Sequence, residues 1–170
     1  FESNISVLTL DCSLTYGYEN KYLNYEGLMY FEDLSVGMSM PLDPVVIDKE
    51  DMLAFANKYD NVPLHTDEEY ARGTRFGKLI APGVMSFMLV WAKYLEKDYF
   101  GEELIAGAST KIEWFKPTFA GDTLTGVVTV TKMVERNPYN GLVELTIDIT
   151  NQDNELVMRD VTEAVIKRKR

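Results

Sequence analysis

The sequence predicts an α+β domain in which a curved antiparallel sheet wraps around one central buried helix. Four segments rich in β-branched residues follow one another late in the chain, over residues 104–115, 123–136, 142–150 and 155–167. Ahead of them, residues 84–97 have helical character, and their first two to three turns are apolar nearly all round. Such a helix must be buried on every side.

The four strand segments are separated by turn signals at residues 117–122, 137–141 and 151–154, which favour antiparallel neighbours. In the third segment apolar and polar residues alternate, which leaves one face of the sheet dry and the other wet. The alternating sets are Val143, Leu145, Ile147 and Ile149 against Glu144, Thr146 and Asp148. A sheet with one dry face that encloses a buried helix is the hot-dog fold.

Shorter helices are expected before the central one. Asp48 can cap a helix that runs to about Lys58 and carries an apolar face of Met52, Phe55, Ala56 and Tyr59. Pro63 then restricts the loop of residues 59–65. Thr66 and Glu69 have the spacing of a capping box, so a short helix is expected directly after His65, running to about Arg72.

Length and composition fit a single globular domain. The chain has 170 residues, of which 46% are hydrophobic and 26% charged. We predict one domain over residues 29–170, preceded by an N-terminal extension of uncertain status, residues 1–28. The net charge of -10 repels phosphate backbones, so a nucleic-acid partner is not expected.

Cys12 is the only cysteine, which excludes an intrachain disulfide and a multi-cysteine zinc site and favours a cytoplasmic setting. The longest uncharged apolar stretch lies between Lys78 and Lys93 and is shorter than the roughly 20 residues of a membrane-spanning helix. We therefore expect a soluble domain with no membrane partner. No pattern indicates a metal or a cofactor.

His65 is the only histidine, so histidine acid-base chemistry has a single candidate. Asp60 lies five residues before it, on the loop that Pro63 restricts. This spacing can aim a carboxylate and an imidazole at one water molecule, as proton transfer near neutral pH requires. Taken alone, a histidine beside an aspartate is more often a capping or surface residue.

Pro82 and Gly83 stand at the start of the central helix. A helix N-terminus has unpaired N–H groups and partial positive charge, so a site beside Gly83 can stabilise an oxygen that gains negative charge. The alternative is that the Pro-Gly pair only makes the turn into the helix.

Together these segments resemble the MaoC-like dehydratases, the (R)-specific enoyl-CoA hydratase family, over most of residues 29–170. The resemblance rests on five segments, which are residues 30–37, 60–67, 70–71 with 76–77, 80–83 and 117–124. Val62 and Pro82 depart from the family pattern, which has asparagine and histidine at these places.

The resemblance implies an enzyme that hydrates enoyl-CoA or dehydrates 3-hydroxyacyl-CoA. Asp60 and His65 would be its catalytic pair, and Gly83 would donate to the substrate oxygen. An acyl-CoA thioester would be the substrate, with coenzyme A as part of it and no separate cofactor. Hot-dog domains usually pair, so a homodimer or larger homo-oligomer is also implied.

Two other functions stay open at the level of sequence. One is a hot-dog acyl-CoA thioesterase, in which a carboxylate activates water against the carbonyl and free thiol is released. The other is a noncatalytic module that binds acyl thioesters, which the departures at Val62 and Pro82 favour.

Overall fold

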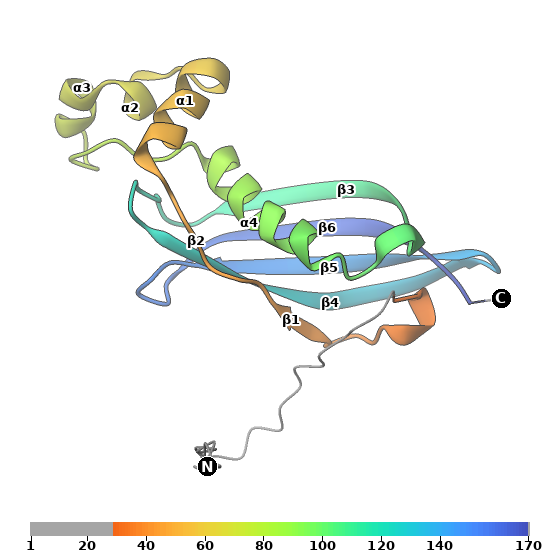
Figure 1. Ribbon diagram of the computed structural model, residues 1–170. Helices are drawn as coiled ribbons and strands as arrows, with labels where there is room; N and C mark the ends of the chain where they lie inside the picture. Colours follow the sequence, from red (N-terminus) through yellow and green to blue (C-terminus); the bar gives the residue numbers. More distant parts are fainter. Residues whose placement is uncertain (1–28, 170) are drawn as a thin grey trace, which may run out of the picture.

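The computed structural model describes residues 29–169, and the predicted extension over residues 1–28 lies outside the described residues. Figure 1 shows a curved sheet with helix α4 (Gly83–Lys97) lying across one face of it. This arrangement confirms the predicted hot-dog fold. None of the helices within residues 29–169 is both long and apolar enough to span a membrane.

The sheet contains six antiparallel strands in the order β1-β4-β5-β6-β3, with β2 paired to β4 as well. The four predicted strands are present, and their ends agree with the prediction to within two residues. Two further short strands were not predicted. The strands are β1 (Ser39–Pro41), β2 (Val45–Val46), β3 (Leu104–Trp114), β4 (Thr123–Asn137), β5 (Asn140–Thr150) and β6 (Leu156–Lys167).

The core lies between α4 and the sheet. The alternating apolar side chains of β5 are all buried, as the pattern predicted, and Val90 of α4 is buried against the same core. A Cβ atom on Gly126 of β4 would stand 2.7 Å from Cγ1 of Val90. The helix therefore approaches the sheet closely where β4 has no side chain.

Helix α4 is less buried than the sequence predicted. Met85, Phe87, Val90 and Tyr94 face the core, but Val84 and Met88 are each 47% exposed and Leu95 is 54% exposed. The expectation of burial on every side is wrong for the single chain, because the sheet covers only one side of the helix.

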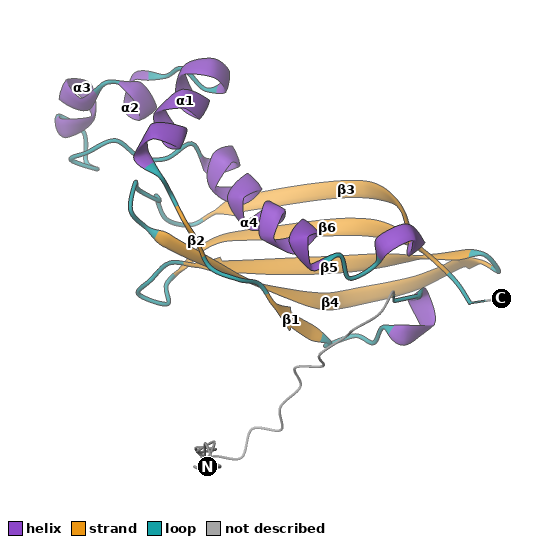
Figure 2. Cartoon of the chain, viewed as in Figure 1, coloured by secondary structure: helices purple, strands orange, loops and turns teal. Residues whose placement is uncertain are grey.

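Three short helices gather beyond one end of the sheet, next to the first turn of α4 (Figure 2). They are α1 (Lys49–Tyr59), α2 (Pro63–Thr66) and α3 (Glu68–Arg72), and 3-10 turns at Phe31–Asp33 and Gly101–Glu103 complete the helical segments. Asp48 caps α1 as predicted, accepting hydrogen bonds from the N–H groups of Glu50 and Asp51. Tyr59 is 65% exposed, so the predicted apolar face of α1 ends before it.

The segment around His65 differs from its prediction. Pro63 begins helix α2 rather than only restricting a loop, which suits a residue without an N–H group. The predicted Thr66–Glu69 capping box is wrong. Asp67 caps α3 instead, because its Oδ1 accepts from the N–H groups of Glu69 and Tyr70 at 2.9 Å.

Candidate active site

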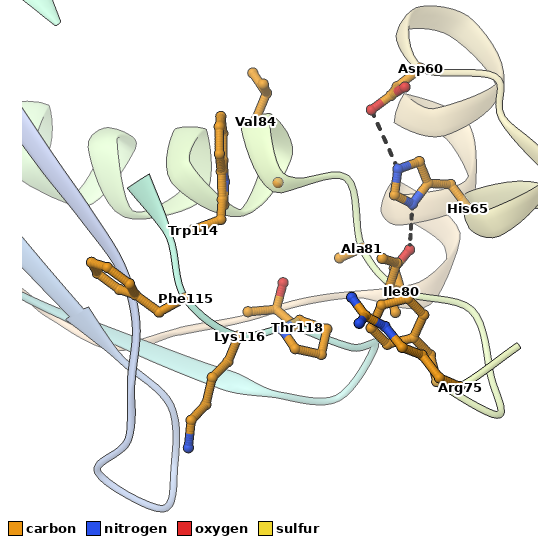
Figure 3. Close-up of a pocket in the computed structure, with 13 residues that line it drawn as sticks. Asp60, His65, Arg75, Ile80, Ala81, Val84, Trp114, Phe115, Lys116 and Thr118 are labelled. Atoms are coloured by element: carbon orange, nitrogen blue, oxygen red, sulfur yellow. Dashed lines mark hydrogen bonds and ion pairs between the residues drawn. The ribbon is translucent and has the colours of Figure 1, made fainter. Parts of the chain in front are cut away.

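Asp60 and His65 lie on neighbouring helices. Asp60 is the C-cap of α1, where its N–H donates to the carbonyl of Ala56 at 2.9 Å. Three residues later α2 begins at Pro63, and one turn brings the ring of His65 back toward the end of α1. The Oδ2 atom of Asp60 and Nε2 of His65 are 3.5 Å apart (Figure 3). The structure thus brings the predicted pair together.

The imidazole of His65 is held from its other side. Its Nδ1 atom is 2.8 Å from the carbonyl oxygen of Ile80. A carbonyl oxygen only accepts, so Nδ1 carries the proton and donates it. In neutral His65 the Nε2 atom is therefore an acceptor, and it faces Asp60. The Ile80 carbonyl fixes both the tautomer and the orientation of the ring.

This geometry places two acceptors side by side. The Nε2 atom of neutral His65 and the carboxylate of Asp60 repel at 3.5 Å unless a proton lies between them. A water molecule satisfies both by donating one hydrogen to each, which leaves its oxygen lone pairs free. The His65 side chain is 11% exposed and that of Asp60 is 40% exposed, so the pair is open to solvent mainly at Asp60.

Thr66 stabilises the loop between the two catalytic candidates. Its hydroxyl lies 3.1 Å from the carbonyl oxygen of Val62 and 3.5 Å from Oδ1 of Asn61. Val62 is 42% exposed and points no polar group at the loop. The segment is therefore fixed by hydrogen bonds from a residue that follows His65, even though Val62 replaces the asparagine of the family pattern.

Gly83 is the first residue of α4 and lines the same pocket as the pair. Pro82 precedes it as N-cap and supplies no side-chain hydrogen bond. Within residues 29–169, the first hydrogen bond that closes a turn of the helix runs from the N–H of Ser86 to the carbonyl of Pro82 at 3.1 Å. The N–H groups of the first turn are thus available to an oxygen in the site.

A buried hydroxyl pair anchors this helix end. Ser86 Oγ and Thr118 Oγ1 are 2.7 Å apart, and the N–H of Ala81 donates to the carbonyl of Thr118 at 2.8 Å. Both side chains are buried. These contacts join the start of α4 to the loop after β3 and hold Gly83 in place.

One pocket of about 410 Å³ brings the three predicted site residues together. This is a normal size for a small-molecule site. The sequence analysis did not assign several of its lining residues, because only the fold carries them there. The lining consists of Asp60, His65, Arg75, Phe76, Ile80, Ala81, Gly83, Val84, Trp114, Phe115, Lys116, Pro117 and Thr118.

The lining residues that were not predicted make one part of the pocket cationic and another part apolar. Arg75 places its guanidinium carbon 4.8 Å from the centre of the Phe76 ring, and Lys116 pairs with Glu155 at 2.6 Å. Trp114 and Val84 provide apolar walls at the other side of the pocket from His65 (Figure 3). Within the described residues, no group of three or more histidine, cysteine, aspartate or glutamate side chains could hold a metal ion.

Comparison with known proteins agrees with this architecture. The family model for the FAS1-like dehydratase domain region matches residues 35–160. An (R)-specific enoyl-CoA hydratase from Rhodospirillum rubrum is 30% identical over 112 residues, which cover 66% of this chain and 76% of that protein.

Solved structures show the same likeness. A MaoC-like dehydratase from Rhodospirillum rubrum superposes with a TM-score of 0.74 at 30% identity, over 84% of this chain and 99% of that one. An (R)-hydratase from A. caviae superposes with a TM-score of 0.64 at 27% identity, over 81% and 99% of the two chains.

The family model matches more than half of the 170 residues, and the predicted class of hydratase or dehydratase is confirmed. The chain therefore belongs to the FAS1-like dehydratase family and is similar in sequence and fold to its MaoC-like members.

Proposed function

We propose that the protein adds water to trans-2-enoyl-CoA thioesters and removes it from 3-hydroxyacyl-CoA thioesters. One observation carries this proposal. His65 is fixed by the Ile80 carbonyl so that its Nε2 faces Asp60 at 3.5 Å, in the same pocket as the free helix end at Gly83. The (R)-specific hydratases among its relatives support the (R)-3-hydroxyacyl product.

The proposed reaction is an acid-base addition of water to the double bond. A water molecule bound by Asp60 and His65 loses one proton to the pair as its oxygen bonds to C3 of the enoyl group. The thioester oxygen gains negative charge, which the N–H of Gly83 stabilises, and the pair returns a proton to C2. Hydroxyl and hydrogen are thus added across the double bond, and neither residue changes its protonation over the cycle.

The chemistry requires only acid-base groups and an oxygen-binding site. We therefore propose that no separate cofactor takes part and that coenzyme A enters as a part of the substrate. The exposed cation Arg75 at the pocket supports an anionic carrier, in a protein with a net charge of -10. A cytoplasmic location, proposed from the single cysteine, fits a coenzyme A substrate.

We also propose that the protein works as a homodimer. Strand β3 is an edge of the sheet, and nearly all its residues are exposed. An uncovered edge strand of this length is a template for pairing, and a second copy offers the same edge across a two-fold axis. Apolar residues of α4 and β3 add a hydrophobic surface, namely Val84, Met88, Leu95, Leu104 and Ile105.

Hydration of crotonyl-CoA tests the proposed reaction. We expect loss of the conjugated enoyl absorbance without release of free thiol. Asp60→Asn and His65→Ala should each reduce the rate by roughly 10²- to 10⁴-fold, the usual effect of losing an acid-base group.

Asp67→Asn is the matched control, because it removes a nearby carboxylate and asparagine still caps α3. This variant should keep the wild-type rate. Thiol release would instead indicate a thioesterase, and binding without turnover on any enoyl thioester would indicate a noncatalytic module. Either result would contradict the proposal.

A further inference from the structure

The indole ring of Trp114 packs closely against Gly83. If Gly83 carried a Cβ atom, that atom would stand 2.4 Å from Nε1 of Trp114, 2.8 Å from Cε2 and 2.9 Å from Cδ1. Three nearly equal distances to adjacent ring atoms mean that the indole lies flat against the glycine. The absence of a side chain at Gly83 thus makes room for the ring as well as for a ligand.

The Trp114 ring lies on the opposite side of the pocket from the proposed catalytic pair. Asp60 and His65 lie on one side of the pocket, and Trp114 stands beside Val84 on the other (Figure 3). Beyond it, α4 carries apolar side chains that the sheet does not cover, at Val84, Met88 and Leu95. Their spacing of four and seven residues places them on one face of the helix.

The reacting atoms of an enoyl thioester have a defined place in this pocket. C3 must reach the water held by Asp60 and His65, and the thioester oxygen must reach Gly83. The polar carrier is best accommodated by the side of the pocket with Arg75, whose side chain is exposed. The apolar tail gains most from apolar walls, so it extends toward Val84 and Trp114.

We propose that Trp114 is the specificity-determining residue that limits the length of the acyl chain. The proposal rests on the hydratase function proposed above. The indole closes the apolar side of the pocket next to Gly83, so short enoyl groups fit in front of it. Longer chains collide with the ring before their reacting carbons reach Asp60 and His65.

The test compares crotonyl-CoA with trans-2-octenoyl-CoA for the wild type and for Trp114→Ala and Trp114→Phe. We expect the wild type to prefer crotonyl-CoA. Trp114→Ala should raise the ratio of kcat/KM for octenoyl-CoA over crotonyl-CoA by at least about tenfold, the scale at which pocket size discriminates between alkyl groups. Trp114→Phe keeps an aromatic ring against Gly83 and should stay near the wild-type ratio.

Tyr139→Ala provides an aromatic control outside the pocket. Tyr139 is 66% exposed and does not line the pocket. Its removal should leave the substrate ratio unchanged. Because the ratio comes from one preparation of each variant, partial loss of folded protein cancels.

Two results would overturn the proposal. One is an unchanged ratio in Trp114→Ala, and the other is a wild type that already prefers octenoyl-CoA. Failure of the proposed function has a different signature, since the wild type would then hydrate neither thioester.

Discussion

The catalytic candidates show how one backbone carbonyl can set the chemistry of a side chain. The bond from Nδ1 of His65 to the Ile80 carbonyl leaves Nε2 as the only nitrogen that can exchange a proton with substrate or water. Ile80 lies three residues before Gly83, so the segment that fixes the imidazole also leads into the helix end that we propose to bind the substrate oxygen. The relative position of the proposed base and the proposed oxygen donor is therefore set by a short piece of chain.

Asp160 is a buried carboxyl group that the proposed reaction does not use. Its side chain is fully buried on β6, and within residues 29–169 its Oδ1 atom has no hydrogen-bond partner. Its Oδ2 accepts from the hydroxyl of Thr162 at 2.7 Å. Burial raises the pKa of Asp160, and the hydrogen bond from Thr162 only partly opposes this effect.

This raised pKa predicts a pH-dependent cost of folding. Below the unfolded pKa, Asp160 is protonated in both states and costs nothing. As the pH rises from the unfolded toward the folded pKa, the unfolded chain ionises while native Asp160 stays protonated, so stability is lost until the folded pKa is passed. Asp160→Asn should remove this loss and raise the free energy of unfolding at pH 7 by about 1 kcal/mol.

Urea unfolding from pH 4 to 8 measures this effect. The gain of Asp160→Asn over the wild type should shrink toward pH 4. Asp148→Asn is a suitable control, because Asp148 is paired with Arg159 on the partly exposed face and its loss should bring no gain. If Asp160→Asn were less stable than the wild type at pH 7, the predicted cost of burying the Asp160 carboxyl group would be contradicted.

At the scale of single elements, the short helix α3 depends on its cap. Asp67 accepts two backbone hydrogen bonds at the N-terminus of α3, so Asp67→Ala should cost about 1 kcal/mol of stability. Asp67→Asn should cost only a few tenths. Thermal or urea unfolding of both variants checks this, and equal losses would mean that charge rather than hydrogen bonding matters.

The same helices mark the limit of what the sequence could predict. Thr66 and Asp67 are both good caps and stand next to each other, so local pattern could not choose between them. Pro63 is compatible with a loop and with a first helical position, and only the packing of α2 decides. The strands β3 to β6 were predictable because each has a long run of β-branched residues, whereas β1 and β2 contain only three and two residues.

The residues of the candidate site also differ in whether the sequence could predict them. Asp60, His65 and Gly83 could be predicted because they belong to local motifs with a chemical reason for their spacing. Trp114 and Arg75 could not, since they reach the pocket from segments far apart in the chain and carry no motif of their own. Trp114 stands out only when its ring is seen against Gly83.

At the scale of the whole molecule, two partly apolar surfaces are uncovered in the single chain. One is the side of α4 that the sheet does not cover, and the other is the edge strand β3. A second copy that pairs along β3 would cover both features at once. The fold prediction and the dimer proposal are thus linked, because the proposed partner would enclose the helix.

Ile105→Lys tests this link. Ile105 is 50% exposed on β3, and a lysine on an edge strand opposes pairing with another edge. We expect light scattering after gel filtration to give the wild type about twice the 19.4 kDa of one chain and the variant a mass close to one chain. Tyr139→Lys, at a position 66% exposed on the β4–β5 turn, should remain dimeric. A monomeric wild type would contradict the proposed dimer, and a dimeric Ile105→Lys would place the interface away from β3.

A monomeric variant should also unfold more easily, because Met88 and Leu95 of α4 would then face water as they do in the single chain.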